Sequence, residues 1–461
     1  SRSMDPNNEG NVIIKQSGTA GRGLFARKNL ENESVILQEA PLAAMQSLEN
    51  LQNVLVCAEC LGFIGSLESQ LAVLGGVPRS ELSEYMQAQP KHIISPIVPC
   101  NQECGEMYCS QVCCDKHFQR CHRFLCTGPI TDEEAASHPL LQFKVHAIQT
   151  NEIFLLVAAV ICHMISEYDK ARGEEGQEGK ARASYKDFVQ ELWWNAAASG
   201  PDSDLGRTLM RLVNESCEYL ASVLRTSPYA SHDAVTELVT PETFSRIIGM
   251  FEQNNLGIRS ESPVAEALRQ VCTAVTMGEE AKQYDSSLGK EEAELSWGSL
   301  LPLLEMAAAG GDDCEDSCCS EQEEEETGNK YEEGQTISEQ SNDGVSEEED
   351  KIEEGGDEVE DMIQEIESAS ILDGTALFSI ICSMNHSCEP NCRVRYRSEK
   401  GQPLLAELET LRPILEGEEL FQSYIDKDLP LHKRRAALYD YGFKCQCPKC
   451  QRQEVQERLV I

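Results

Sequence analysis

The chain has 461 residues and is 41% hydrophobic, which is enough apolar material for a sizeable core and, at this length, for two to four domains. It carries 79 acidic against 39 basic side chains, a formal net charge of −40. Residues 311–370 contain 25 acidic and 2 basic residues, so −23 of that charge is local and the other 401 residues carry −17. A moderately acidic folded part without a basic face disfavours binding to duplex DNA.

Membrane and secretory signals are not apparent in the sequence. No segment reaches the roughly 18 uninterrupted apolar residues that span a bilayer. The longest apolar stretch, residues 153–165, is shorter and contains His163. The N-terminal residues do not have the pattern of a signal peptide. We therefore expect a soluble protein with no membrane partner, located in the nucleus and cytoplasm.

Residues 11–56 have the character of strands and turns. A short β-type run, VIIK, precedes three closely spaced glycines in SGTAGRGLFA, and a second strand-like run, SVILQEAPLAAM, follows them. Apolar and β-branched runs bounded by glycine-containing turns favour strands. This part of the chain is predicted to be a β-region.

The cysteine-rich block at residues 57–126 contains four pairs of potential zinc ligands. In a reducing compartment disulfides rarely persist, so clustered cysteines are interpreted first as metal ligands. The pairs have the spacings C-x2-C, C-x3-C, C-x3-C and H-x3-C, and eight such ligands suffice for two tetrahedral zinc sites. His117 lies near the last pair and competes with its histidine. The eight candidates are Cys57, Cys60, Cys100, Cys104, Cys109, Cys113, His122 and Cys126.

Helical patterns dominate residues 140–310. Apolar residues fall on nearly every face of residues 140–167, which predicts one long buried helix. The strongest start signal is Thr240 as the N-cap with Pro241 at the first helical position. Helices are also predicted at residues 185–195, 206–224 and 241–254.

Residues 311–356 are acidic, rich in serine and glycine, and almost free of large apolar residues. Such a segment cannot offset its own ordering entropy, so it is predicted to be disordered. This segment has two alternative roles: it attracts a basic protein, or it is a passive linker. β-character returns at residues 371–428, and residues 429–461 form a tail with a basic helix and the last cysteines. The order of elements favours one β-fold split by insertions.

Four further motifs belong to a second constellation. GRGLFA lies at residues 21–26, NHSCEPN at 385–391, EGEELFQSYID at 416–426 and YGFKCQCPKC at 441–450. The three cysteines of the last motif suit zinc but need a fourth ligand, which Cys388 supplies if the chain folds back.

In this order the four motifs resemble the SET domain of protein-lysine methyltransferases. EMYCSQVC followed by HRFLC resembles the MYND zinc finger, and a MYND finger inserted after the first SET strands resembles the SMYD (SET and MYND domain-containing) family. Because the chain stops shortly after Cys450, it resembles the short branch that lacks a C-terminal helical repeat domain. The resemblance implies an α+β fold. It comprises a SET N-terminal part (11–56), a MYND-type finger with a long insertion (57–126), a helical insert (140–310), the acidic segment (311–356), a SET C-terminal part (371–428) and a cysteine-rich post-SET tail (429–461).

The resemblance also implies how the metal ligands are grouped into three zinc sites. In the MYND pattern the first and third pairs share one ion, and the second and fourth pairs share another. The insertion within the finger is longer than usual, and the second pair has one extra residue. The implied sets are Cys57, Cys60, Cys109 and Cys113; Cys100, Cys104, His122 and Cys126; and Cys388, Cys445, Cys447 and Cys450.

The implied reaction is transfer of a methyl group from S-adenosylmethionine to a lysine of a histone tail or another basic protein, such as a ribosomal one. Tyr424 and Tyr441 match the channel tyrosines of the family and are the expected catalytic residues, with Tyr424 orienting amine and methyl for in-line transfer. A packing role for Tyr441 or Phe443 and a solvent-exposed turn position for Arg22 are the alternatives. The expected cofactor contacts are Gly21, Arg22, Gly23, Asn385, His386, Tyr424 and Phe443.

A second function class remains in view. The chain could be a catalytically silent MYND scaffold that recruits Pro-rich partners, although Tyr424 together with an intact NHSCEPN motif argues against it. We expect a monomer whose finger contacts such partners in addition to its substrate. The substrate protein, the target lysine and the number of methyl groups stay open.

Overall fold

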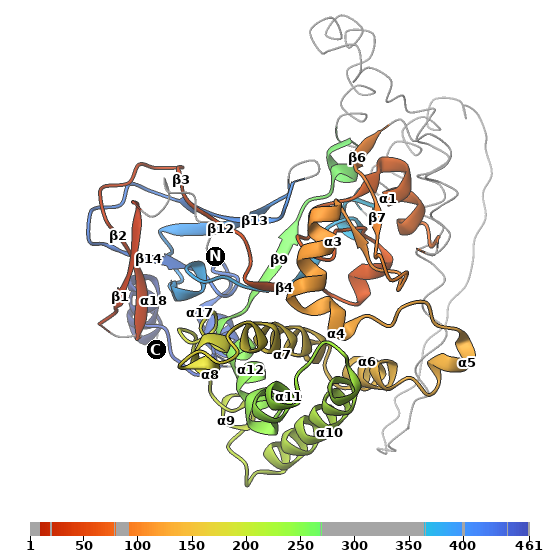
Figure 1. Ribbon diagram of the computed structural model, residues 1–461. Coiled ribbons are helices and arrows are strands. Elements are labelled where there is room, and N and C mark those ends of the chain that lie inside the picture. Colours follow the sequence, from red (N-terminus) through yellow and green to blue (C-terminus); the bar gives the residue numbers. More distant parts are fainter. Residues whose placement is uncertain are drawn as a thin grey trace, which may run out of the picture.

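The computed structural model describes residues 10–18, 21–77, 92–267, 366–398, 402–439 and 441–459, with residues 79, 269 and 364 singly. The acidic segment 311–356 and the later part of the helical region lie outside these ranges. None of the helices described here combines the length and apolar character needed to cross a bilayer. Figure 1 shows strands β1, β2 and β14 and helix α18 on one side, the cysteine-rich block on the other, and helices α6 to α12 below them.

The first sheet brings together segments from both ends of the chain. β2 is paired with β1 on one edge and with β14 on the other, and Leu24 lies opposite Leu420 with both side chains fully buried. β11 pairs with the other edge of β14 in parallel orientation. β14 therefore lies between β2, which begins in the GRG turn, and β11, which contains the Asn-His pair of NHSCEPN. The strands are β1 (Val12–Gln16), β2 (Arg22–Ala26), β14 (Glu419–Gln422) and β11 (Asn385–His386).

Two three-stranded antiparallel sheets complete the β-core. In each of them one strand from residues 35–46 pairs with a strand from the C-terminal part of the chain. Their inward residues share one hydrophobic core with the first sheet, and Phe378, Leu408 and Ile258 within it are fully buried. The strands are β3 (Val35–Glu39), β13 (Leu405–Thr410) and β12 (Cys392–Arg397) in one sheet, and β4 (Ala43–Gln46), β10 (Leu372–Leu377) and β9 (Leu256–Ser260) in the other.

The cysteine-rich block is held by short elements around a small core of its own. Leu55, Ile64 and Tyr108 are buried there among the cysteines. Ser110 caps the helix that holds Cys113 by accepting its backbone N–H at 3.2 Å. The 3₁₀ helix η1 (Glu49–Gln52) precedes the block and contacts β10. The elements of the block are β5 (Gly65–Ser66), α1 (Leu67–Leu74), β6 (Ile93–Ser95), β7 (Val98–Pro99), β8 (Met107–Tyr108), α3 (Gln111–His117), the π-helix η3 (Phe118–His122) and α4 (Arg123–Leu125).

The helical region confirms some predicted helices and corrects others. α12 covers residues 241–254 with Thr240 as its cap, as predicted. The single helix expected over 140–167 is wrong: the side chain of Asn151 accepts the N–H of Ile153 at 3.0 Å and starts a new helix there. The elements are α5 (Asp132–Ala135), α6 (Pro139–Thr150), α7 (Ile153–Lys170), α8 (Gln177–Ala181), α9 (Trp193–Ala196), α10 (Asp204–Thr226), α11 (His232–Leu238) and α12 (Pro241–Asn254).

The helix predicted at residues 185–195 is also wrong, because only α9 is helical there. Tyr185 is buried, and its hydroxyl lies 2.8 Å from Nδ1 of His163 on α7. Arg246 of α12 donates to the carbonyl of Gln190 at 2.9 Å. These contacts hold residues 185–192 in a non-helical conformation against α7 and α12. Tertiary packing therefore overrides the local helical pattern.

Two helices form the C-terminal tail, which ends beside the first sheet (Figure 1). They contact each other, and Leu431 on the first of them and Leu438 at its C-cap are buried in a small cluster with Cys388, Cys445 and Cys450. The helices are α17 (Leu431–Ala437) and α18 (Pro448–Leu459), and the 3₁₀ helix η6 (Ile381–Ser383) lies between β10 and β11.

A buried carboxylate in the cysteine-rich block pairs with two basic side chains. The carboxylate of Glu59 is only 1% exposed and lies 2.8 Å from Lys116 Nζ and 2.8 Å from a terminal nitrogen of Arg120. We expect Glu59→Gln to lower the free energy of unfolding by about 3 kcal/mol, because it leaves the Arg120 guanidinium without its buried counter-charge. Chemical denaturation monitored by circular dichroism measures this.

The matched control is Glu174→Gln, which removes an exposed partner of Lys180. Exposed pairs contribute about 0–1 kcal/mol, so this variant should unfold close to the parent protein. Equal effects of the two substitutions would show that the Glu59 network does not stabilise the fold.

Candidate active site and metal-binding sets

The four motifs of the second constellation meet at the edge of the first sheet. Because β14 pairs with both β2 and β11, the GRG turn lies close to Asn385 across 363 residues of sequence. The side chain of Asn385 donates to the carbonyl oxygen of Arg22 at 3.0 Å and to Oε1 of Glu419 at 2.7 Å. The expected cofactor residues of both halves are therefore held together by hydrogen bonds.

Both glycines of the GRG turn have a physical reason in the structure. Gly21 has φ +73°, a left-handed conformation that glycine adopts without strain. A Cβ at Gly23 would lie 2.3 Å from Glu419 Oε1 and 3.1 Å from Asn385 Nδ2, so a larger residue would push the Glu419 carboxylate away from Asn385. The side chain of Arg22, between them, is exposed.

Glu419 is a site residue that the sequence analysis missed. Its Oε2 accepts from the hydroxyl of Ser17 at 3.0 Å, and its Oε1 accepts from Asn385. It thus joins three segments: the turn before β2, β11 and β14. The available signal was its position inside the EGEELFQSYID motif, where an acidic residue faces the glycine of another strand.

Four aromatic rings cluster beside this junction. The ring of Tyr424 lies 5.3 Å from His386, 5.3 Å from Tyr441 and 6.4 Å from Phe443 between ring centres. His386 and Phe443 are 5.8 Å apart. Tyr441 is 51% exposed and Phe443 is 39% exposed, so one face of the cluster is open to solvent. The rings of Tyr441 and Phe443 pack on Tyr424 and are also partly exposed, so a packing role does not prevent contact with a ligand.

Tyr424 is fixed at both its backbone and its hydroxyl. The hydroxyl donates to the carbonyl oxygen of Met384 at 2.6 Å. The backbone N–H donates to Nδ1 of His386 at 3.0 Å, and the carbonyl of Tyr424 accepts from the Tyr441 hydroxyl at 3.4 Å. Burial raises the pKa of Tyr424 to about 12, with smaller contributions from Cys382 and Tyr441, so the hydroxyl remains a donor at neutral pH.

His386 connects the aromatic cluster to the sulfur atoms below it. Burial, with a smaller effect of the Arg434 charge, lowers the pKa of His386 to about 4, so the ring is neutral at pH 7. Since Nδ1 accepts from Tyr424, the proton is assigned to Nε2, which lies 3.3 Å from Sγ of Cys388. The ring therefore bridges a tyrosine of the candidate site and a cysteine of the tail.

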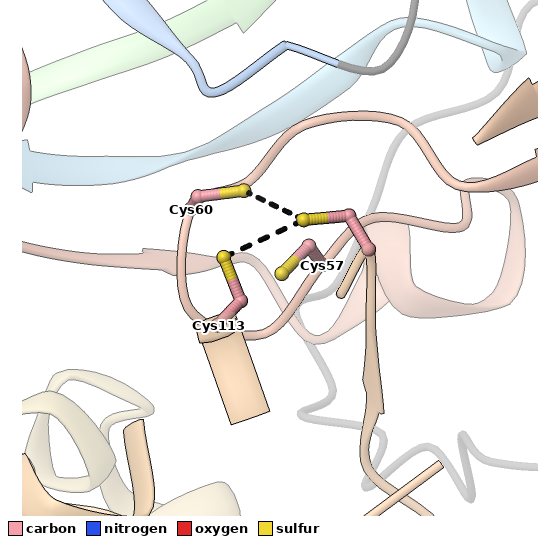
Figure 2. A group of neighbouring side chains, drawn as sticks. Cys57, Cys60 and Cys113 are labelled. Carbon is pink, nitrogen blue, oxygen red and sulfur yellow. Dashed lines mark hydrogen bonds between the residues drawn. The ribbon is translucent and has the colours of Figure 1, made fainter. Parts of the chain in front are cut away.

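The predicted ligands assemble into three sets of four, with the grouping that the resemblance to the MYND and SET families implied. Within each set the ligand atoms all lie within 4.8 Å of one another. Figure 2 shows Cys57, Cys60 and Cys113 of the first set pointing toward a common centre, and Sγ of Cys109 lies 3.4 Å from Cys113 and 3.7 Å from Cys60. The sets are Cys57, Cys60, Cys109 and Cys113; Cys100, Cys104, His122 and Cys126; and Cys388, Cys445, Cys447 and Cys450.

In the second set, the structure distinguishes between His117 and His122 as the ligand. Nε2 of His122 lies 3.4 Å from Sγ of both Cys100 and Cys104. His117 instead directs its Nδ1 to the hydroxyl of Tyr108 at 3.1 Å, with its ring stacked on His122. His122 therefore belongs to the ligand set, and His117 supports it.

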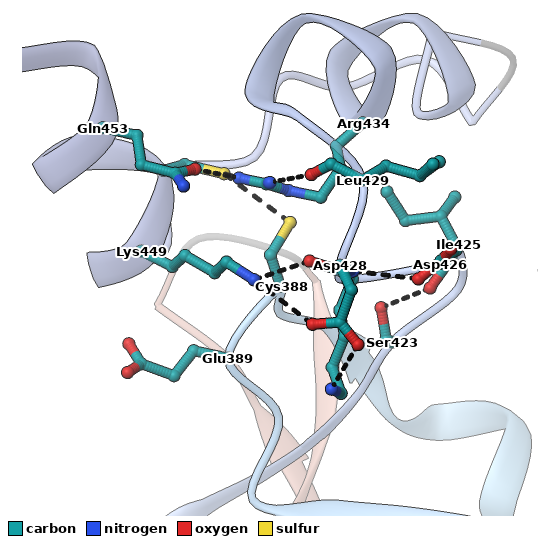
Figure 3. Close-up of polar contacts among 12 residues, drawn as sticks. Cys388, Glu389, Ser423, Ile425, Asp426, Asp428, Leu429, Arg434, Lys449 and Gln453 are labelled. Carbon is teal, nitrogen blue, oxygen red and sulfur yellow. Dashed lines mark hydrogen bonds and ion pairs between the residues drawn. The ribbon is translucent and has the colours of Figure 1, made fainter.

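The third set closes the tail onto the NHSC segment. Sγ of Cys388 lies 3.6 Å from Cys450 and 4.0 Å from Cys445. Figure 3 shows the guanidinium of Arg434 directed to this set and to α18, donating to Sγ of Cys450 at 3.6 Å and to the side chain of Gln453 at 2.6 Å. The Arg434 side chain is buried, and a buried cation requires an anionic neighbour such as a thiolate.

These sets have the dimensions of tetrahedral zinc sites. Zn–S bonds of about 2.3 Å place two sulfurs of a tetrahedron about 3.8 Å apart, close to the 3.4–4.0 Å separations above. The cysteines in the described part of the chain are free thiols. All four positions of each set are filled by protein, which is the arrangement of a structural rather than a catalytic metal.

Comparison with known proteins gives the context of the site. The SET domain family matches residues 272–425, a range that includes NHSCEPN and Tyr424. Histone-lysine N-methyltransferase ATXR2 of Arabidopsis thaliana is 27% identical over 501 residues, which is 95% of this chain and 90% of that protein. Protein-lysine N-trimethyltransferase SMYD5 of Homo sapiens is 22% identical over 446 residues, 94% of this chain and 84% of the relative. N-lysine methyltransferase SMYD2 of Homo sapiens is 42% identical over 78 residues, 17% of each protein.

Proposed function

We infer that the chain is a SMYD-like protein with a SET domain, a protein-lysine N-methyltransferase that uses S-adenosylmethionine. The observation that carries this inference is the junction of the GRG turn, Asn385, His386 and Tyr424 beside the first sheet. The SET match includes Asn385, His386 and Tyr424, and the similarity to two lysine methyltransferases over most of the chain supports the inference. The fold supports the same conclusion, since its β-core combines strands from residues 11–56 and 371–428 with the single strand β9 (Leu256–Ser260), and the other parts are inserted between them.

For the cofactor we propose contacts at the surface where these motifs meet. S-adenosylmethionine supplies an electrophilic methyl group on a positively charged sulfur. The backbone at Gly21 and Gly23 can approach it closely, the exposed Arg22 can pair with its carboxylate, and Phe443 offers a partly exposed ring for its adenine. The neutral His386 and the fixed Asn385 complete the proposed set.

The proposed catalytic groups act on the substrate lysine. Its amine has an unperturbed pKa of about 10.4 and must lose a proton before it can attack the methyl group. The rings of Tyr424 and Tyr441 would shield a bound amine from water on one side, which disfavours the charged ammonium. The Tyr424 hydroxyl, held at Met384, orients the amine for in-line transfer, and no covalent intermediate is needed.

We propose that residues 57–126 are a MYND-type finger, that residues 429–461 are a post-SET tail, and that both are held by zinc. The expected content is three zinc ions per chain, one for each four-ligand set. Elemental analysis of the purified protein measures it directly. One ion or none in a well-folded preparation would contradict the assignment.

The substrate we propose is a basic protein, a histone tail or a ribosomal-type protein, in keeping with the acidic charge of the chain. The finger offers a second surface for Pro-rich partners, and the protein is proposed to act as a monomer in the nucleus and cytoplasm. The deciding experiment supplies methyl-labelled S-adenosylmethionine and the purified protein to a lysate of cells that lack it, and identifies the labelled residue. Label on lysine is expected. No labelled lysine with a folded, zinc-loaded protein would favour the silent scaffold.

A further inference from the structure

An acidic residue outside all the motifs lies below the candidate site. Glu39 is the last residue of β3, and its carboxylate accepts the backbone N–H of Ile380 at 3.0 and 3.2 Å and that of Ile381 at 3.0 Å. Removal of this carboxylate from water raises the pKa of Glu39 to about 7, although these N–H groups oppose the shift. The contacts span 341 residues of sequence, so they are a feature of the tertiary fold.

The residues that Glu39 holds lead directly to the tyrosine hydroxyl. The carbonyl oxygen of Ile381 accepts the N–H of Met384 at 3.0 Å, and the carbonyl oxygen of Met384 accepts the hydroxyl of Tyr424 at 2.6 Å. Ile381 and Met384 are both buried. The Glu39 carboxylate is therefore connected to Tyr424 through hydrogen bonds joined by the backbone of Ile381 and Met384, so the position of η6 sets the position of the Met384 carbonyl.

The single turn η6 needs this external support. A 3₁₀ helix of three residues, Ile381–Ser383, has too few internal hydrogen bonds to fix its own geometry. Its N-cap, Ile380, has no side-chain capping bond, and the only side chain recorded at its first N–H groups in the described residues is that of Glu39. The position of the Met384 carbonyl thus depends on the carboxylate of Glu39, which lies on strand β3.

We propose that Glu39 is a positioning residue for methyl transfer, which fixes the Met384 carbonyl through η6 and thereby aims the Tyr424 hydroxyl. This inference rests on the proposed methyltransferase function. A carboxylate suits the role because both of its oxygens only accept hydrogen bonds. An amide in its place keeps the size but turns one of these acceptors into a donor that faces the N–H groups of Ile380 and Ile381.

The test is a double-mutant cycle between Glu39→Gln and Tyr424→Phe. The rate of methyl transfer is measured with saturating labelled S-adenosylmethionine and a heat-inactivated lysate as the substrate pool, at about pH 8.5, where the Glu39 carboxylate is ionised. Glu39→Gln should lower the rate of the parent protein about tenfold. In the Tyr424→Phe background it should change the rate less than about twofold, because the hydroxyl it positions is gone. Calorimetry should find the same cofactor affinity for Glu39→Gln and the parent protein.

The matched control is Glu407→Gln, which alters a buried carboxylate of the neighbouring strand β13. This carboxylate accepts from Gln38 at 2.6 Å and, within the part of the chain that the structure describes, makes no hydrogen bond to η6. It should leave the rate within about twofold of the parent protein. Equal losses from Glu39→Gln in both backgrounds would make Glu39 a purely structural residue and overturn the proposal. If Glu39→Gln does not fold, Glu39→Asp, which retains the charge, replaces it in the cycle. Failure of both to fold would likewise overturn the proposal, whereas a parent protein without activity would contradict the proposed function itself.

Discussion

Tyr424→Phe should reduce the rate of methyl transfer by about 10- to 100-fold while the affinity for S-adenosylmethionine stays the same. The substitution removes only the hydroxyl that is held at the Met384 carbonyl and is proposed to orient the substrate amine, and loss of one such hydrogen bond in the transition state costs about 1–3 kcal/mol. The ring contacts with His386, Tyr441 and Phe443 remain, so the surface proposed for the cofactor keeps its shape. Labelled-methyl transfer and calorimetry of cofactor binding measure the two quantities separately.

Tyr439→Phe is the matched control for this substitution. Tyr439 lies close to the same loop but is 82% exposed, so removal of its hydroxyl should change neither the rate nor the affinity. If Tyr424→Phe transfers methyl groups as fast as the parent protein on the same substrate, Tyr424 is a packing residue and its proposed role is wrong.

Cys447→Ser should remove one of three zinc ions and weaken cofactor binding by about tenfold or more. Loss of one ligand opens the third set, and the chain between α17 and α18 that contains Phe443 then has no anchor to Cys388. Because Nε2 of His386 faces Cys388, the disturbance should also reach the histidine that holds Tyr424. Elemental analysis and calorimetry measure the two losses.

Cys113→Ser provides the comparison, since it opens the first set in the cysteine-rich block. It should also remove one zinc ion, yet it should leave cofactor affinity within about twofold of the parent protein, because its ligands make no recorded contact with the aromatic cluster in the described residues. Equal losses of affinity in the two variants would mean that zinc supports the fold as a whole and not the tail in particular.

Local spacing carried most of the prediction of the site. The pairs of cysteines and the NHSCEPN and GRG motifs are each contained within a few residues, so they are visible in the sequence. The spacing predicted the ligand pairs, and the family resemblance implied the sets that the structure brings together. The spacing alone left His117 and His122 as alternatives, because both lie within reach of the last pair. The choice between the two histidines depends on Tyr108, whose hydroxyl is hydrogen-bonded to Nδ1 of His117.

Residues that act across long sequence distances were missed for a physical reason. Glu39 contacts Ile380 across 341 residues and Glu419 contacts Ser17 across 402 residues, and neither contact produces a periodic pattern or a fixed spacing. The incorrect helices have a related origin. The helical pattern at residues 185–195 gives way to the contact of Tyr185 with His163, and Asn151 divides the expected long helix by accepting a backbone N–H. Local propensity does not contain either event.

The central position of β14 also has a consequence for how the protein folds. The sheet edge that holds Arg22 and Asn385 closes a loop of 363 residues, whereas helices α6 to α12 contact one another within residues 139–254. Contacts between distant residues form late, since they must first overcome the entropy of closing long loops. The helical region can therefore fold before the sheet, and during refolding compact, helical molecules should accumulate before they become catalytically competent.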